Sequence, residues 1–188
     1  MSDPVPINGS ECRRKAIHAI ADILEKFRID SAFVGKVAEA AWLGDPFEDG
    51  SVDVLAVLSP DRRQQIPMMA MQNRCFRVDK EAVEAAQELD LIPMAFSSDG
   101  ENVGVHVLIA SNALYSIMIR DSVEASIDQQ TVRVVRPEDL ALLLVVDDSE
   151  EAKEKIRKIL DRAGDGFDVD GFNERLESIG LGSRRIDR

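Results

Sequence analysis

Residues 32–44 read AFVGKVAEAAWLG, and residues 51–55 read SVDVL. The first stretch predicts a strand over residues 31–34, a turn at Gly35, and an Ala-rich helix over residues 36–43 that ends at Gly44. A loop over residues 45–50 then leads to a strand over residues 51–58. This strand is almost continuously apolar, which is typical of a central strand with both faces covered. The order strand, glycine turn, helix, loop and buried strand therefore sets the expected centre of the fold.

The chain on either side of this centre alternates between the helical and the strand period. Apolar residues recur with helical spacing over residues 16–27, and Ser10 or Asn8 is the candidate cap. Strands are expected at residues 76–78, 91–96, 103–110, 123–127 and 132–135, with helices after Asp79 and over residues 112–119. Residues 62–73, which are rich in Met, fit neither period clearly. This alternation predicts an α/β fold of the α+β type, a mixed sheet covered by helices.

Beyond Arg136 only helical patterns remain. Pro137 suits the first position of a helix that runs through residue 146. A charged amphipathic helix follows over residues 149–163, and a final helix, for which Asp170 is the expected cap, stops at Gly180. We therefore expect an α/β core over residues 1–136 and a C-terminal helical extension over residues 137–188, packed on the core as one structural unit.

Composition limits the classes of function. The 188 residues carry a formal net charge of −12, from 35 acidic against 23 basic residues, so no direct nucleic-acid binding is expected. The two cysteines fit a reducing compartment. The start of the chain lacks a signal-peptide pattern, and no apolar run approaches the ~18 residues of a membrane span. We expect a cytoplasmic protein without membrane contact, for which a homo-oligomer is possible.

The quoted stretch resembles the nucleotidyltransferase superfamily, which has the DNA polymerase beta-like fold. The similarity is to small bacterial members of the minimal and abortive-infection type, which run from a strand and a glycine pair into an Ala-rich helix, a loop and an Asp-x-Asp strand. Residues 132–140, VRVVRPEDL, resemble the helix start that the family shows after its sheet. The resemblance implies a nucleotidyltransferase-like core over residues 1–136.

The family's chemistry depends on carboxylates and on close backbone contact with phosphate. Two carboxylates at positions i and i+2 of a strand point to one face, and with a third acid they hold divalent metals that clamp a nucleotide triphosphate. The glycine pair lets the backbone approach the phosphates at a helix N-terminus. The resemblance thus implies Mg²⁺ and a nucleotide triphosphate as cofactor and substrate if the chain is active.

This sequence departs from the family pattern at several positions, including Leu144, where relatives usually have a lysine. Ser51 stands where the first acid of the pair is lost, so Asp53 is the remaining candidate catalytic residue and metal ligand. Lys36 replaces the second glycine, which leaves Gly35 and Lys36 as candidate nucleotide-binding residues. The strand expected to carry the third acid has His106 instead, a poor ligand for Mg²⁺ that we interpret as a core or sheet-edge residue. We therefore expect a degenerate site and a non-catalytic module that binds a nucleotide or a protein.

Two other hypotheses stay open at this point. In the first, an active Mg²⁺-dependent nucleotidyltransferase uses Asp53 with acids of the preceding loop, and Asp49 serves as a second metal ligand. In the other, the chain is a structural or interaction module with an unrelated α/β fold. A protein partner is implied by the resemblance as well, because the family includes members of toxin–antitoxin pairs. The plainer interpretation of Lys36 is a solvated lysine, and that of Asp53 is a strand acid satisfied by hydrogen bonds.

Overall fold

Seven strands form a single mixed sheet in the computed structural model, which describes residues 3–86, 90–147 and 149–186. The expected core and extension reach residues 1–2 and 187–188, which lie outside the described residues. The strands lie in the order β3-β4-β5-β2-β1-β7-β6. Their bounds are β1 Ser31–Val34, β2 Val52–Ala56, β3 Phe76–Arg77, β4 Leu91–Ser98, β5 Glu101–Ile109, β6 Val123–Ile127 and β7 Gln130–Val134. The predicted mixed sheet is confirmed.

The centre of the sheet contains the segments that the quoted stretch encodes. β1 pairs with β2 in antiparallel orientation, and β2 pairs with β5 in parallel orientation. The helix between β1 and β2 is α2, Gly35–Leu43, and Gly44 ends it in the left-handed conformation, as expected. β2 is shorter than predicted, since it ends at Ala56 rather than at residue 58. After Ala56 the chain leaves the sheet, and Val57 still donates its amide to the Asp30 carbonyl.

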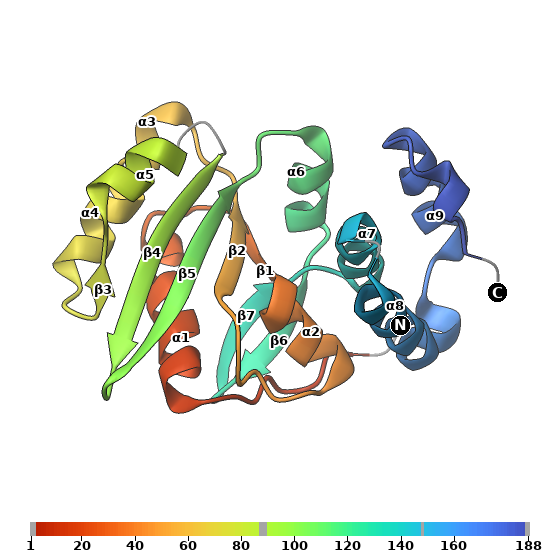
Figure 1. The fold of residues 1–188 in the computed structure, drawn as a ribbon, viewed down its shortest axis with the longest axis horizontal. Helices are drawn as coiled ribbons and strands as arrows, with labels where there is room; N and C mark the ends of the chain where they lie inside the picture. Colours follow the sequence, from red (N-terminus) through yellow and green to blue (C-terminus); the bar gives the residue numbers. More distant parts are fainter. Residues whose placement is uncertain (1–2, 87–89, 148, 187–188) are drawn as a thin grey trace.

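Helices cover the two faces of the sheet unequally. One face packs against α1, Glu11–Lys26, and against α4, Gln65–Gln72, in a core that includes Ile17, Val54 and Val107. The other face packs against α2 and the later helices, in a second core around Trp42 and Leu140. Figure 1 shows α1 behind the sheet and α2 in front of it. The remaining helices include α3 Pro60–Arg63, α5 Lys80–Ala86, α6 Ala113–Arg120, α7 Pro137–Asp147, α8 Glu150–Ala163 and α9 Val169–Ser178.

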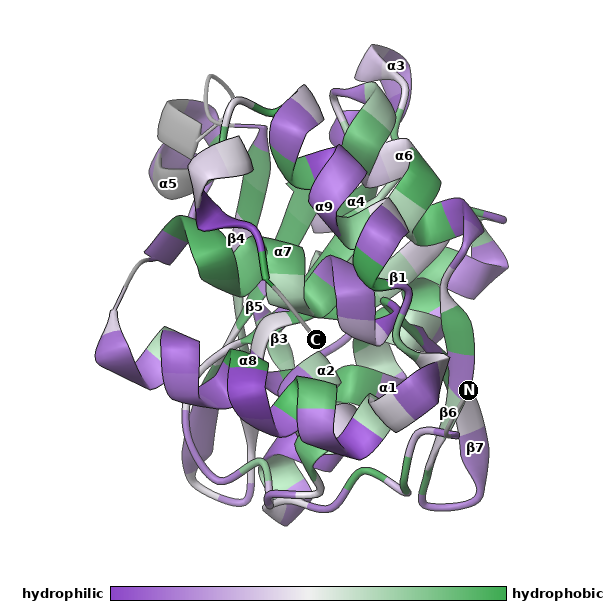
Figure 2. Cartoon of the chain, turned by 90° about the vertical axis from the view of Figure 1, so that its right-hand side faces the viewer, coloured by the Kyte–Doolittle hydropathy of each residue, from purple (hydrophilic) through white to green (hydrophobic). Residues whose placement is uncertain are grey.

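The C-terminal helices pack on one another as well as on the sheet. Nearly every residue of the first two turns of α7 is buried, and in Figure 2 this helix is mostly green, whereas α8 and α9 carry purple segments. Two charged residues at its start, Glu138 and Asp139, are also buried. The Glu138 carboxylate accepts a hydrogen bond of 2.9 Å from the amide of Asp168, and Asp139 pairs with Arg175 of α9. The acidic start of α7 thus attaches α9.

Three local predictions need correction. The N-cap of α9 is Asp168, whose carboxylate accepts from the Gly171 amide at 2.9 Å, so the expected cap Asp170 lies inside the helix. Ser10 occupies the N-cap position of α1, but its hydroxyl accepts from Arg13 and caps no backbone amide. The turn between β4 and β5 is confined to Asp99 and Gly100, which both have positive φ, because the strands continue further than predicted.

Candidate functional site

The turn from β1 into α2 brings the backbone against the side chain of Asp53. Gly35 has a φ of +56°, in the left-handed region that favours glycine. A Cβ atom at this position would lie 2.9 Å from Oδ2 of Asp53, closer than side-chain carbons approach. Val34 is the register partner of Asp53, so the antiparallel pairing of β1 and β2 holds this geometry. Only glycine fits here without a shift of the neighbouring carboxylate.

The other carboxylate oxygen of Asp53 has two partners. Oδ1 accepts a hydrogen bond of 2.8 Å from the Ser51 hydroxyl, and the Nδ1 atom of His106 lies 2.9 Å from the same oxygen. Asp53 and His106 are register partners on the parallel strands β2 and β5, which brings the two side chains together. A carboxylate only accepts, so Nδ1 donates and the neutral imidazole keeps an acceptor at Nε2.

The electrostatics of this pair favour a protonated imidazole. The hydrogen bond to Asp53 raises the pKa of His106 above its ordinary value, although partial burial opposes the shift. Both side chains are reachable by solvent, with 38% of His106 and 24% of Asp53 exposed. The site is therefore a half-buried carboxylate–imidazole pair rather than a satisfied core residue.

His106 is the site residue that sequence reasoning missed. The interpretation of a core or sheet-edge residue is wrong, because the buried face of β5 is made by Val103, Val105, Val107 and Ile109. Alternation along the strand places His106 on the opposite face, the face of Asp53. The alternation was visible in the sequence, but the pairing of β2 with β5 that aligns the two residues was not.

Lys36, the candidate phosphate ligand, has acidic neighbours. Its Nζ atom lies 3.5 Å from Asp49 and 3.7 Å from Glu39, and its aliphatic part packs against Gly50. Glu39 also pairs with Lys155 of α8 at 3.1 Å. Asp49 therefore lies beside the helix start, in contact with Lys36 through its exposed carboxylate.

These donors suit a pair of divalent metals poorly. Among residues 3–86, 90–147 and 149–186, no group of three or more His, Cys, Asp or Glu side chains is placed to hold a metal ion. Around Asp53 the neighbouring groups are a neutral hydroxyl and an imidazole. Mg²⁺ prefers several oxygen ligands, and imidazole is a poor substitute. One carboxylate offers much less negative charge than paired cations require.

An open stretch of sheet adjoins the Asp53–His106 pair. On β4 and β5 the residues of one face are buried, whereas those of the other face are half-buried, including Pro93, Ala95, Gly104 and His106. Pro93 is the register partner of His106. In Figure 1 no helix lies in front of these two strands. A molecule that reaches Asp53 from this side meets a surface that includes Pro93, Ala95 and Gly104.

Comparison with solved structures identifies the fold. An antigenic nucleotidyltransferase-like protein from Paracoccidioides brasiliensis aligns over 98% of this chain and 97% of its own, with 14% identity and a TM-score of 0.54. ANT(2")-Ia in complex with adenylyl-2"-tobramycin aligns over 89% and 98%, with 17% identity and a TM-score of 0.57. The lincomycin-bound lincosamide antibiotic adenylyltransferase LnuA aligns over 81% and 97%, with 12% identity and a TM-score of 0.52.

The chain therefore has a nucleotidyltransferase fold, as the resemblance implied, and the hypothesis of an unrelated α/β fold is wrong. Comparison with protein-family models found no match, and comparison with curated proteins found none. No helix among the described residues is long and apolar enough to cross a membrane.

Proposed function

We propose that this chain binds a nucleotide in the inherited cleft of its nucleotidyltransferase fold and does not transfer it. The observation that carries the proposal is the lone carboxylate of Asp53, whose Oδ1 already accepts from Ser51 and His106. Metal-dependent transfer needs enough anionic oxygen to hold two divalent cations about 4 Å apart against their mutual repulsion. A hydroxyl at position 51 and an imidazole at position 106 add no negative charge to the cleft.

Binding of the phosphates would use the start of α2. Val34 occupies the N-cap position and has no side-chain acceptor, so the first amide groups of the helix have no side-chain cap. Such amides attract anions, and the Lys36 ammonium lies at the same helix end. A bound phosphate would replace Asp49 and Glu39 as the partner of Lys36. Nucleotide binding without a metal ion is consistent with this chemistry, because the Lys36 ammonium supplies the positive charge.

Calorimetry with ATP, GTP, CTP and UTP, each with and without Mg²⁺, tests the proposal. We expect at least one nucleotide to bind without Mg²⁺, and Lys36→Ala to weaken that binding by roughly tenfold through loss of a charge-assisted contact. Lys158→Ala, which removes an exposed lysine of α8, is the matched control and should leave the affinity unchanged. Absence of binding for all four nucleotides would contradict the proposal.

The second candidate is an active Mg²⁺-dependent nucleotidyltransferase that uses Asp53 and Asp49. The observation in its favour is the contact between Asp49 and Lys36, which holds a loop acid at the start of α2. A transfer assay with nucleotides labelled at the α-phosphate separates the two candidates. Turnover that requires Mg²⁺ and is lost in both Asp53→Asn and Asp49→Asn would support the transferase. A protein partner, the other occupant that the resemblance implies, is tested by pulldown with the purified chain.

A further inference from the structure

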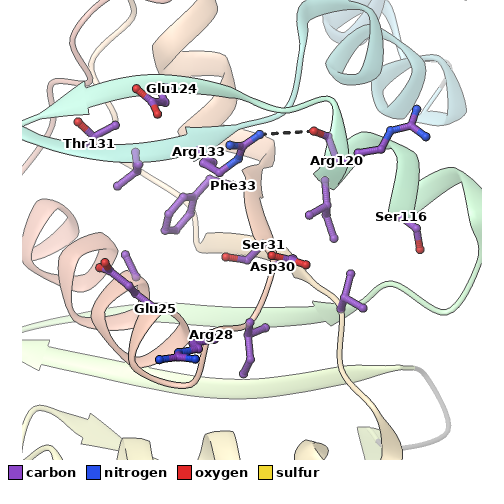
Figure 3. A pocket seen from close by; sticks show the side chains of 15 residues that line it. Glu25, Arg28, Asp30, Ser31, Phe33, Ser116, Arg120, Glu124, Thr131 and Arg133 are labelled. Carbon is purple, nitrogen blue, oxygen red and sulfur yellow. Dashed lines mark hydrogen bonds between the residues drawn. The ribbon is translucent and has the colours of Figure 1, made fainter.

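A groove of about 740 Å³ lies at the other end of β1 from Gly35. Figure 3 shows it between the end of α1, the beginning of β1, α6 and the β6–β7 hairpin. Ser31 and Phe33 of β1 line it on one side, and Thr131 and Arg133 of β7 line it on the other. Ser31 is the first residue of β1, and Val34, the last, pairs with Asp53. The groove and the Asp53–His106 pair therefore lie at opposite ends of β1.

The groove exists because β1 and β7 pair at a single position. The two strands are parallel neighbours in the sheet, but their register contains only the pair Phe33 and Val134. The next contact toward α7 is the hydrogen bond of 3.1 Å from the Val135 amide to the Phe33 carbonyl. In the opposite direction, toward Ser31, the strands diverge and the ladder is not continued. The groove lies in this divergence.

The backbone of β1 presents hydrogen-bonding groups to the groove. The amide of Val57 donates to the Asp30 carbonyl, so the peptide groups of residue 30 point toward β2. Peptide groups alternate in direction along a strand, and those of Ser31 and Phe33 therefore point toward β7. Phe33 finds its partner there, as the bond from Val135 shows. The peptide groups of Ser31 face the gap where β1 and β7 are not paired.

The hairpin presents the matching edge. The amide of Ile7 donates to the Ser126 carbonyl at the outer side of β6, so the peptide groups of Ser126 point away from β7. Its register partner Thr131 must then direct its own peptide groups outward from the hairpin, toward β1. Arg133, two residues further, points the same way; its carbonyl takes part in the bridge between Phe33 and Val134, and its amide is left for a ligand. Two backbone edges thus face one another across the groove.

The groove is held open by contacts at both ends of the hairpin. The Arg133 guanidinium donates to the Ser122 carbonyl at 2.6 Å and to its hydroxyl at 2.7 Å, which ties β7 to the end of α6. At the hairpin turn, Asp128 pairs with Arg14 of α1. Because these contacts fix the hairpin in place, β7 does not need to move to admit a ligand. The edges are preorganised, which lowers the cost of binding.

The side chains around the groove match a peptide better than a simple anion. The buried Phe33 and Val132 lie among its lining residues, and Val57, 44% exposed, lines it as well. The charged part of the lining consists of three arginines and three acids: Arg28, Arg120, Arg133, Glu25, Asp30 and Glu124. Three carboxylates would repel a phosphate or sulfate, whereas a peptide with charges of both signs finds partners for each.

We propose that this groove binds an extended peptide segment of a partner protein, which pairs as an added strand with the open edges at Ser31 and at Thr131–Arg133. The peptide's main chain makes the hydrogen bonds that β1 and β7 do not make with each other, as in other cases of strand addition. An apolar residue contacts Phe33 and Val57, and flanking charged residues meet the acidic and basic side chains of the groove. The proposal is independent of nucleotide binding at Gly35.

An array of acetylated and amidated hexapeptides with alternating apolar and charged residues is the probe. We expect a subset to bind, and the tightest of them to shift the amide resonances of Ser31 and Arg133 in NMR spectra of the full chain and to slow their hydrogen exchange. Thr131→Trp fills the groove from an exposed strand position and should weaken that peptide by at least about tenfold.

Ser126→Trp is the matched control, because Ser126 is the cross-strand partner of Thr131 but does not line the groove. It should bind the peptide as the unmodified chain does, and NMR spectra of both variants without peptide check that each is folded. The proposal is overturned if no peptide binds, if Thr131→Trp binds as well as Ser126→Trp, or if the resonance shifts lie away from β1 and β7.

Discussion

The Nδ1 atom of His106 lies 2.9 Å from Oδ1 of Asp53, although 53 residues separate the two in sequence. Each residue lies on a central strand, and the parallel register of β2 and β5 sets them side by side. The pair gives the site an acid–base group whose charge depends on pH. With the imidazole protonated the two groups cancel, and with it neutral the cleft keeps one negative charge.

Asp53→Asn should lower the pKa of His106. The hydrogen bond to the carboxylate is the largest cause of the raised pKa, and an amide supports the imidazolium less well. The pKa of His106, followed by NMR titration of its ring protons, should fall toward the ordinary value near 6.5. An unchanged pKa of His106 would mean that Asp53 does not bind it in solution.

The same pair should make stability depend on pH. Because the pKa of His106 is raised in the folded chain, its contribution to stability is complete below the unfolded value near 6.5 and is lost as pH rises through the folded value. The difference in free energy of unfolding between the natural chain and Asp53→Asn should therefore shrink as pH rises above about 6.5. Urea unfolding at several pH values measures it, and a flat difference contradicts the expectation.

Gly35→Ala should destabilise the chain more than Gly100→Ala. Both glycines have positive φ, but an added Cβ meets Asp53 at Gly35 and nothing within 4 Å at Gly100. The backbone cost of about 1 kcal/mol is common to both, and the clash adds to it only at Gly35. Urea unfolding of the two variants gives the comparison. Equal losses of stability would show that the carboxylate moves aside without cost.

The free energy of unfolding of the natural chain should fall as pH rises, and Asp139→Asn should abolish this fall. Burial raises the pKa of Asp139 to about 6, even though Arg175 and Arg136 act in the opposite direction. A raised carboxyl pKa means that the folded chain holds this proton more tightly, so stability falls as pH rises from about 4 through 6, by on the order of 3 kcal/mol. The fall should be absent in Asp139→Asn when both proteins are unfolded in urea across this range.

Trp42→Phe should cost about 1–3 kcal/mol of stability. The indole Nε1 of this buried residue donates to the Val135 carbonyl at 2.8 Å, and phenylalanine leaves that carbonyl without its partner. Circular dichroism during urea unfolding measures the loss. Leu43→Ala, at the next and only half-buried position of α2, is the comparison and should cost less. A neutral Trp42→Phe substitution would contradict the assigned role.

Local patterns predicted the elements well where short-range chemistry decides them. The boundaries of β1 and the glycine turns at both ends of α2 follow from residues within a few positions of each other. The pattern over residues 62–73 fits neither period, because the apolar face of α4 is only two turns long; these residues contain the end of α3 and all of α4. Helix boundaries set by competing acids, such as Asp168 against Asp170, depend on a single hydrogen bond.

The candidate site was predictable only in part, for a physical reason. Gly35 and Asp53 meet through the pairing of two strands that are close in sequence. His106 meets Asp53 through a parallel pairing across more than 50 residues, and the register of such a pairing is set by packing of the whole sheet. The divergence of β1 and β7 is likewise a property of the assembled sheet and leaves no trace in the local pattern.

Trp42 is the single tryptophan of the chain, and it is buried where α2 meets the segment that leaves β7. Its fluorescence therefore reports on this one junction, without the overlapping signals that complicate most proteins. A ligand that shifts α2 against Val135 would therefore change the surroundings of the indole. Fluorescence titration of the unlabelled protein would follow such a shift.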